Sequence, residues 1–510
     1  AVYSHVSDNL RSICDAEAGG GAEVILCTVG VNLKDCPPFA SEHRASLGED
    51  ELRNWQRLFD LGVAAECAGE HETALEKYRQ ASMIDDEYAE LHYRMARCRT
   101  ALHQHDVSRS DYGNARDLDA LRFRADSRLN QAIRDVAQQS DAELLDVEKL
   151  LSENSVDGIP GEDLFLEHVH MNFHGNYLIA RGLYERVAPR LKTITKSDRQ
   201  VTALSEQTCM TLLAYTDWDR YEISKNILDL LSRPPFTGQL DHRLRLAGVR
   251  RELSDSAKAM EAHGLRQIAN QYRRALERSP TDLYLRQKKS NVLAMAGDFS
   301  GAARELEAVA KAWPLDIKTR LEWGGLLVAT NRLQEAREVY GEISRMPHCQ
   351  TKCQADVAFN EGVLHERLGD PRGAIVRYQT AIRLKPDMVS AYGNTALLLA
   401  GQGDFDGAVR HNRKVIDLAP EEFRGYLNLG LLYVQQNRFD RAVEQLEEAA
   451  TRAPDNGQVL FALGQVQLKL LQVDSAVLAL GRAAQLMPKN GQVLATLGEA
   501  LIRQGRTSDG

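Results

Sequence analysis

The chain has 510 residues, and its 63 Lys and Arg against 72 Asp and Glu give a formal net charge of -9. A chain of this length exceeds what one hydrophobic core supports, so we expect about two or three folding units. The acidic balance provides no global basic field, which argues against a nucleic-acid partner. No apolar run reaches the roughly 18 residues of a membrane-spanning helix, and we expect no membrane contact by these residues.

The first predicted elements are a helix over residues 2–18 and a strand over residues 22–28. The strand, Ala-Glu-Val-Ile-Leu-Cys-Thr, is a short apolar run suited to burial on both faces. A loop with two prolines follows at residues 31–39. Because the chain opens inside a helix with neither an initiator Met nor a signal sequence, we expect that upstream sequence is missing.

Residues 50–120 interrupt this pattern with helical repeats. Small and large residues recur there at the offsets of a helical hairpin, and a degenerate second copy follows. The first copy carries Leu61, Gly62, Ala65, Ala74, Tyr78 and Ala81. We interpret the segment as an insertion, so the strands on either side of it should share one sheet.

After the insertion, the sequence predicts a helix over 126–139, a strand over 143–147 and a helix over 173–191. Alternating helices and strands predict an open α/β sheet whose site lies at the C-terminal ends of parallel strands. This α/β domain would consist of residues 1–49 and 121–192.

The segment before the last of these helices holds the main candidate site. Glu167 lies three residues before His170 at a loop-to-helix junction. A carboxylate that contacts an imidazole fixes its tautomer and stabilises its charged form, as a general base that activates a hydroxyl requires. We therefore predict that His170 is a catalytic base and that Glu167 orients it.

Two other interpretations of this segment remain open. Histidine and asparagine are common for structural reasons where a helix begins. A zinc site built from His168, His170 and His174 is the third interpretation. We expect neither a metal nor another cofactor.

Three further side chains are candidates for lining the cleft. Asn32 follows the first strand, Arg124 precedes the helix at 126, and Asn172 lies beside His170. Asn32 would otherwise cap its turn. Arg124, together with Arg122, would hold an anionic substrate group or else belong to a solvated cluster at the helix start.

The C-terminal half has a regular spacing of prolines. Pro280 and Pro314 are 34 residues apart, and the same spacing separates Pro386, Pro420, Pro454 and Pro488. Each proline ends a helical hairpin, because its ring cannot continue the helix. We predict a superhelix over residues 249–510, preceded by a helical linker or degenerate repeats at 193–248.

Small and large residues also recur between the prolines. One unit carries Tyr426, Leu429, Gly430, Tyr433, Ala442, Leu446 and Ala449. From about residue 245 onward this pattern resembles the tetratricopeptide repeat, which implies a concave groove for a peptide or protein. The longer spacing from Pro347 to Pro386 indicates an insertion near residues 348–354, and the last unit has one helix before Gly510.

Eight cysteines are scattered without paired spacing, so we expect no disulfide framework. Most fall on predicted helices or a strand, where cysteine behaves as a small buried apolar residue. The tightest group is His348 and Cys349 with Cys353. It would serve either packing or, as the alternative, a metal ion.

The N-terminal domain resembles the C-terminal half of an SGNH (GDSL-like) hydrolase over about residues 1–50 and 120–192. The resemblance rests on the order of helix, strand and loop and on Glu-His-Val-His-Met-Asn-Phe-His-Gly-Asn at residues 167–176. That family ends with an Asp-x-x-His block, which implies His170 as base and Glu167, in place of Asp, as the orienting carboxylate. No Gly-Asp-Ser nucleophile block is present, so the resemblance places the nucleophile in missing upstream sequence.

Two functions follow from these observations. The favoured one is ester hydrolysis or acyl transfer by an SGNH-like domain that carries a protein-binding superhelix. The resemblance also implies a bacterial, extracytoplasmic protein with a membrane anchor upstream. The alternative is a non-catalytic tetratricopeptide scaffold for protein–protein interaction.

Overall fold

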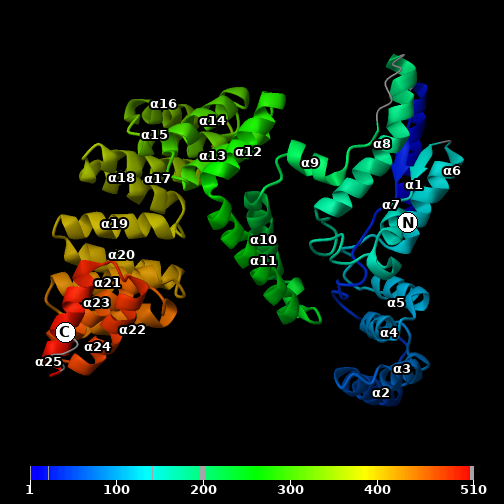
Figure 1. Ribbon diagram of the computed structural model, residues 1–510, viewed down its shortest axis with the longest axis horizontal. Helices are drawn as coiled ribbons and strands as arrows, with labels where there is room; N and C mark the ends of the chain where they lie inside the picture. Colours follow the sequence, from blue (N-terminus) through cyan, green and yellow to red (C-terminus); the bar gives the residue numbers. More distant parts are fainter. Residues whose placement is uncertain (1, 21, 141, 196–201, 506–510) are drawn as a thin grey trace. The chain divides into compact units, whose positions relative to one another are not determined.

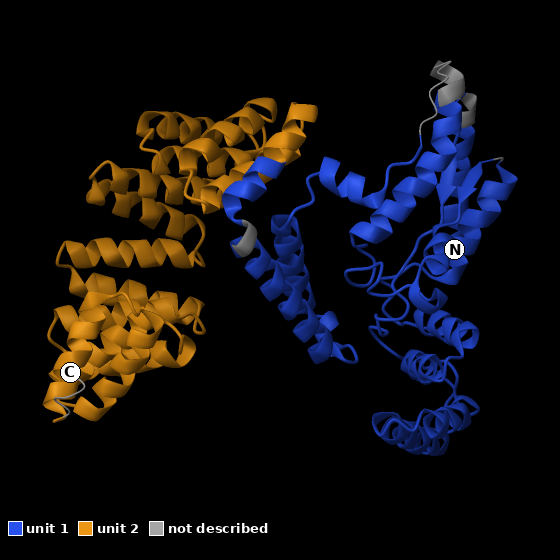
Figure 2. Cartoon of the chain, viewed as in Figure 1, with its two compact units in different colours: residues 1–271 blue, residues 272–510 orange. Residues whose placement is uncertain are grey.

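The computed structural model describes residues 2–20, 22–140, 142–195 and 202–505. The chain is almost entirely helical and divides into two compact units, unit 1 at residues 1–271 and unit 2 at residues 272–510 (Figure 2). Unit 2 begins later than the superhelix predicted from residue 249. The finer predicted divisions at residues 49, 120 and 192 stay predictions, and Gly510 lies outside the described residues.

Unit 1 contains the two strands, which pair in parallel in the register Ile25↔Glu143, Leu26↔Leu144 and Cys27↔Leu145. Its elements are α1 (Val2–Gly19), β1 (Ile25–Cys27), α2 (Glu49–Cys67), α3 (His71–Ser82), α4 (Ala89–Ala101), α5 (His105–Asp117), α6 (Ser127–Gln139), β2 (Glu143–Leu145), α7 (Val147–Glu153), η1 (Val156–Gly158), α8 (Phe173–Thr195), α9 (Glu206–Leu212), α10 (Asp217–Leu231), η2 (Phe236–Gly238) and α11 (His242–His263), with α12 (Leu265–Arg278) crossing into unit 2 (Figure 1).

The sheet is smaller than the sequence predicts. Each strand has three residues, and within the described part of the chain these two strands are the whole sheet. The predicted strand at 143–147 is cut short because the Asp146 carboxylate caps α7, which begins at Val147. The expectation of an open, SGNH-like α/β sheet is therefore corrected to a two-stranded parallel sheet between helices.

Alternate side chains along each strand pack against helices on opposite faces of the sheet. Leu26 of β1 packs with Cys14 of α1 and Val136 of α6, whereas Leu145 of β2 packs with Leu151 of α7 and Leu178 of α8. This is the two-residue period expected for a strand covered on both faces. The segment between β1 and β2 forms α2 to α6, of which α2 to α5 are the predicted helical insertion, so the insertion lies between two strands of one sheet.

Unit 2 is a series of antiparallel helix pairs, and its described residues contain no strand. The pairs are α13 (Leu283–Met295) with α14 (Phe299–Ala312), α15 (Ile317–Ala329) with α16 (Leu333–Ser344), α17 (Thr351–Arg367) with α18 (Pro371–Leu384), α19 (Val389–Gly401) with α20 (Phe405–Leu418), α21 (Phe423–Gln435) with α22 (Phe439–Arg452), and α23 (Gly457–Lys469) with α24 (Val473–Leu486), followed by α25 (Gly491–Arg503). Pro386, Pro420 and Pro454 each come two residues after a helix ends, and Ala442 and Ala476 are fully buried, as predicted.

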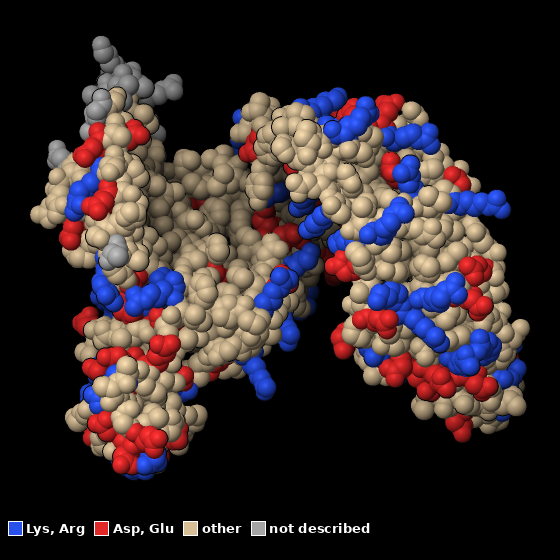
Figure 3. All heavy atoms as spheres, turned by 180° about the vertical axis from the view of Figure 1, so that it is seen from behind, with Lys and Arg blue, Asp and Glu red and all other residues tan. Residues whose placement is uncertain are grey.

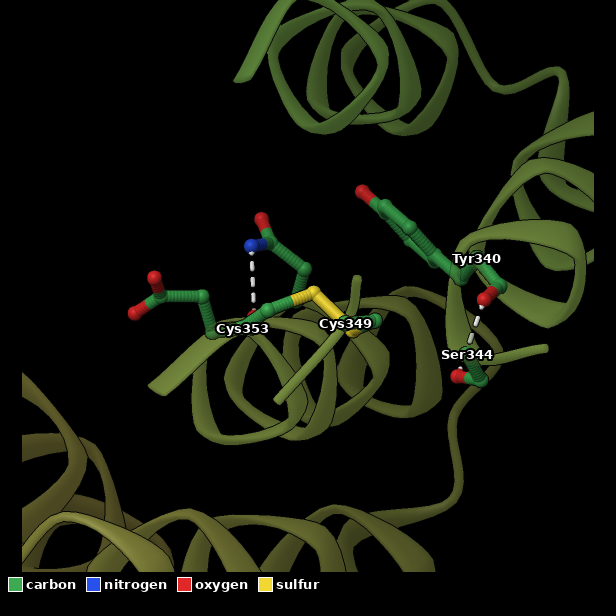
Figure 4. Close-up of a disulfide and its surroundings, with 6 residues drawn as sticks. Tyr340, Ser344, Cys349 and Cys353 are labelled. Carbon is green, nitrogen blue, oxygen red and sulfur yellow. Dashed lines mark hydrogen bonds between the residues drawn. A yellow bond between two sulfur atoms is a disulfide. The ribbon is translucent and has the colours of Figure 1, made fainter. Parts of the chain in front are cut away.

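The insertion predicted near residues 348–354 coincides with an unexpected disulfide. Cys349, just before α17, is bonded to Cys353 within its first turn, close to Tyr340 and Ser344 of α16 (Figure 4). Helix α17 has 17 residues, against 13 in α15 and α19. The sequence predicts no disulfide framework and assigns these two cysteines to packing or a metal, whereas the structure joins them, so the bond occupies both sulfurs of the proposed metal group.

Glycine at the centre of α17 allows the two helices of its hairpin to approach closely. A Cβ on Gly362 would lie 2.4 Å from the Tyr378 ring of α18, whereas a Cβ on Gly393 of α19 would meet no atom within 4 Å. Tyr378 is fully buried, and its hydroxyl donates to the Glu366 carboxylate, so its ring has little room to move. The two glycines thus differ: a side chain at Gly362 would meet a ring with little room to move, whereas one at Gly393 would meet open space.

Gly362→Ala is expected to destabilise the α17–α18 hairpin by about 1–3 kcal/mol, because the added methyl group overpacks the Tyr378 ring. Hydrogen exchange of the α17 and α18 amides should accelerate by about 5- to 150-fold. Gly393→Ala is the matched control. Its new methyl group meets open space and alanine favours a helix more than glycine does, so hydrogen exchange of the nearby amides should slow or stay unchanged. Equal effects of the two variants would contradict the packing argument.

Candidate functional site

The candidate site is a tight turn that connects Phe165 to Met171, which form an antiparallel bridge. At this turn the buried Glu167 carboxylate accepts hydrogen bonds from the backbone N–H groups of His168 at 2.6 Å, Val169 at 3.4 Å and His170 at 2.7 Å. A buried carboxylate needs such donors to remain charged. Glu167 is thus the group around which the turn folds.

His170 extends from this turn into solvent. Its Nδ1 contacts the Glu167 carboxylate, which is the pairing that their three-residue spacing predicts, and its side chain is 70% exposed. With Nδ1 held by a carboxylate, Nε2 is the ring nitrogen left to exchange a proton with a reacting group. The geometry is that of an oriented base; its catalytic use stays a prediction.

His168 has the opposite environment. Its ring packs edge-on against Phe39 and Phe236, with centroids 5.5 Å and 5.3 Å away, and its Nδ1 also contacts the Glu167 carboxylate. Burial, with the nearby positive charge of Arg124, lowers the pKa of His168 to about 4. His168 is consequently a neutral packing residue.

The third histidine does not join the other two. Nδ1 of His174 lies 2.8 Å from the Glu206 carboxylate of α9. Within the ranges that the structure describes, no three His, Cys, Asp or Glu side chains converge as metal ligands. The zinc interpretation therefore has no geometric support.

Unit 1 is expected to lose stability on acidification through His168. Its pKa is about 4 in the folded chain and about 6.5 in an unfolded one. Between these values the unfolded chain binds more protons, so the free energy of unfolding should fall as the pH drops from about 6.5 to about 4. Urea unfolding can be followed by Trp55 and Trp218 in a background with Trp313 and Trp323 replaced by Phe. His168→Gln should flatten the pH dependence; an unchanged slope would contradict this assignment.

Asn32 is buried and stabilises the turn from behind. Its Nδ2 donates to the Glu167 carbonyl oxygen at 3.0 Å, and its Oδ1 accepts from the Asp35 N–H at 2.9 Å. Its own N–H donates to the His168 carbonyl oxygen at 3.0 Å. These bonds are those of a residue that caps a turn, which is the alternative interpretation, and the cleft-lining role stays a prediction.

Arg124 is also buried rather than part of a solvated cluster. Its Nη1 donates to the carbonyl oxygens of Asn32 at 3.0 Å and Cys36 at 2.7 Å, and its Nη2 donates to the Asp119 carboxylate at 3.2 Å. Only Arg122 shows the predicted exposed position, paired with Asp126. With its terminal nitrogens engaged in this way, Arg124 fixes the loop after β1 and is not placed to hold a substrate anion.

Asn172 is the candidate that borders a cavity. Its Oδ1 accepts from the Gly175 N–H at 3.0 Å at the start of α8, and its Nδ2 donates to the Asp163 carbonyl oxygen at 2.8 Å. The cavity, of about 330 Å³, is formed with Phe165 and Leu166 and closed by apolar residues of α10 and α11: Ile223, Ile227, Leu244 and Val249. Helix α10 comes from the segment that the sequence predicts as a helical linker or degenerate repeats, and α11 begins there and continues past residue 248.

The helix pairs of unit 2 define an α-helical repeat array. Residues 288–343, 359–423 and 427–492 match the tetratricopeptide repeat family. The C-terminal region of the chain therefore consists of tetratricopeptide repeats, as the residue pattern predicts.

Several solved structures are similar to parts of this chain. A tetratricopeptide repeat protein from Parabacteroides merdae is 15% identical over 49% of this chain and 97% of its own, with a TM-score of 0.36. PilW, a type IV pilus biogenesis factor, is 16% identical over 42% of this chain and 99% of its own, with a TM-score of 0.37. MamA is 24% identical over 34% and 94%, with a TM-score of 0.28. No curated protein matches the sequence.

The family match covers the helical repeats, and the comparisons give no support to the SGNH resemblance. Among the helices that the structure describes, none combines the length and apolar character needed to cross a membrane. The surface turned toward the viewer in Figure 3 carries acidic and basic side chains side by side. A continuous basic face is not visible there.

Proposed function

We propose that unit 2 binds a peptide or protein partner on the inner face of its repeat array. The observation that carries this proposal is an asymmetry of the helix pairs: at three places first helices of successive pairs contact each other, α15 with α17, α21 with α23 and α23 with α25. Helices approach each other most closely on the concave side of a curved array, so this side is formed by the first helices. Such concave surfaces are what helical repeats use for binding.

Site-specific cross-linking tests this proposal. A photoreactive residue replaces Leu431 on α21, a first helix, or Leu478 on α24, a second helix; both leucines are exposed. The Leu431 position should capture a defined partner segment, and the synthetic segment should bind the full chain with a Kd of about 10 μM or tighter. Equal capture at Leu478, or no saturable binding by the segment, would contradict an inner-face site.

We also propose a second function, ester hydrolysis or acyl transfer in which His170 is the general base and Glu167 orients it. The exposed imidazole held by a buried carboxylate supports this candidate. Within the described residues no serine hydroxyl is hydrogen-bonded to the His170 ring, so a nucleophile has yet to be located. The repeats support the binding function better than they support this one.

A further inference from the structure

Unit 1 contains another cavity of about 330 Å³, which lies between the helical insertion and the segments that follow the two strands. One wall is α5 of the insertion, and the other is formed by the loop after β1 and by α7, which follows β2. Its lining, over the residues that the structure describes, includes neither Glu167 nor His170. The volume falls within the range of small-molecule sites, about 300–1,000 Å³.

The wall formed by the loop and α7 is apolar. Val31, Leu33 and Leu151 line it, and none of the three is more than 8% exposed. A Cβ on Gly30 would lie 2.3 Å from a methyl carbon of Leu151, so the loop and α7 are in direct contact and the wall is continuous. This wall suits an aliphatic chain, which gains from close contact and needs no hydrogen bond.

One face of α5 forms the polar wall. Its lining residues recur at the three- and four-residue spacing of a single helix face: Asp106, Arg109, Ser110, Gly113 and Arg116. A Cβ on Gly113 would meet no atom within 4 Å. The cavity is therefore unfilled beside Gly113, and a larger side chain at this position would occupy it.

Two of the charged groups that line the cavity neutralise each other. The Arg116 side chain is 4% exposed, and its Nη1 donates to the Glu148 carboxylate at 2.9 Å. Its Nε donates to the Asp117 carboxylate at 2.7 Å, and Glu148 also accepts from Arg134 at 2.7 Å. Because each of these charges has a partner of opposite sign, neither Arg116 nor Glu148 needs a ligand.

Arg109 is the cation that remains. Its side chain is 44% exposed, and it pairs at 3.5 Å with Asp106, whose side chain is 96% exposed. An exposed pair of this kind contributes little to stability and is easily exchanged for another partner. A Cβ on Gly158 would lie 2.6 Å from Nη2 of Arg109, so the guanidinium lies against the η1 turn. Arg109 thus offers a positioned cation beside an apolar wall.

We propose that this cavity binds a small aliphatic carboxylate, with its chain on the apolar wall and its carboxylate on Arg109. A guanidinium binds a carboxylate through parallel hydrogen bonds. At about 30 Å³ for each group the size of a water molecule, the cavity holds about ten non-hydrogen atoms, which is the size of octanoate. A singly charged group suits the site better than a phosphate, because the carboxylates of Asp106 and Glu148 also border the cavity. This proposal does not depend on either function proposed above.

Isothermal titration calorimetry of the full chain with octanoate tests the proposal. We expect saturable binding with a Kd below about 1 mM, and at least about tenfold weaker binding of octylamine, 1-octanol and octyl phosphate, which have the same chain. Arg109→Gln should weaken octanoate binding by at least about tenfold. Arg53→Gln is the matched control, because Arg53 is also exposed and also paired with an aspartate three residues away. Its octanoate affinity should be unchanged.

Gly113→Leu should abolish octanoate binding with unchanged helical circular dichroism, because leucine fills the cavity. Gly325→Leu is its control, since a Cβ on Gly325 also meets no atom within 4 Å but belongs to α15 of unit 2.

Three results would each overturn the proposal: no saturable binding of octanoate, binding no tighter than that of 1-octanol, or binding that survives both Arg109→Gln and Gly113→Leu. If Gly113→Leu does not fold, the comparison of Arg109→Gln with Arg53→Gln decides.

Discussion

Glu167→Ala is expected to lower the free energy of unfolding of unit 1 by about 3 kcal/mol. The variant removes a buried carboxylate that accepts three backbone hydrogen bonds, from His168, Val169 and His170. Those N–H groups would be left without their acceptor at a turn that also receives hydrogen bonds from Asn32. Such unsatisfied groups cost more than an ordinary lost contact.

Urea unfolding followed by Trp55 and Trp218, with Trp313 and Trp323 replaced by Phe, measures this loss. Glu153→Ala is the matched control, because Glu153 is 61% exposed and only weakly paired with Lys149. Glu167→Gln, which retains one accepting oxygen, should fall between the two variants. A Glu167→Ala variant as stable as Glu153→Ala would show that the carboxylate does not hold the turn.

The repeat array could be predicted from the sequence because its determinants are local and recur. Each proline ends the helix just before it, and Gly362 faces Tyr378 of the next helix, only 16 residues along the chain. The same contact recurs between Gly324 and Tyr340. A pattern repeated in several copies identifies the fold even where one copy is irregular, as at the Cys349–Cys353 disulfide.

The contact between Glu167 and His170 was predictable for the same reason. The positions of Asn32 and Arg124, which are buried behind this turn, were not. Glu167 and His170 are three residues apart, so a contact between them follows from local geometry. Asn32 meets Glu167 across 135 residues, and Arg124 meets Asn32 across 92. One sequence does not reveal such partners, which is why both residues were assigned to a cleft instead of to the interior.

The helices that close the cavity lie where the sequence predicts helical segments, but nothing in their own sequence names the partner that they cover. Ile227 and Leu231 of α10 pack with Phe236 against Cys36 and Phe39 of the loop after β1. Their apolar residues indicate an amphipathic helix, which a linker would not need. That signal was sufficient to predict a packed helix but not the surface that it covers.

His170→Ala is expected to lower any acyl-ester turnover of the full-length protein by at least about 100-fold, the scale of a lost general base. The reason is geometric: His170 is exposed while its Nδ1 is held by the Glu167 carboxylate. The measurement is kcat/KM on a chromogenic acyl ester across pH. Because the His170 side chain is mostly exposed, its removal should change stability far less than Glu167→Ala does.

His174→Ala is the control that separates a base from any nearby imidazole. His174 is also partly exposed and also contacts a carboxylate, that of Glu206, but it lies in α8 outside the turn. Turnover that falls in the His170 variant and not in the His174 variant would assign the base to the turn. Turnover unchanged by His170→Ala, or absent from the full-length protein, would leave Glu167 as a structural carboxylate and the tetratricopeptide scaffold as the function of the chain.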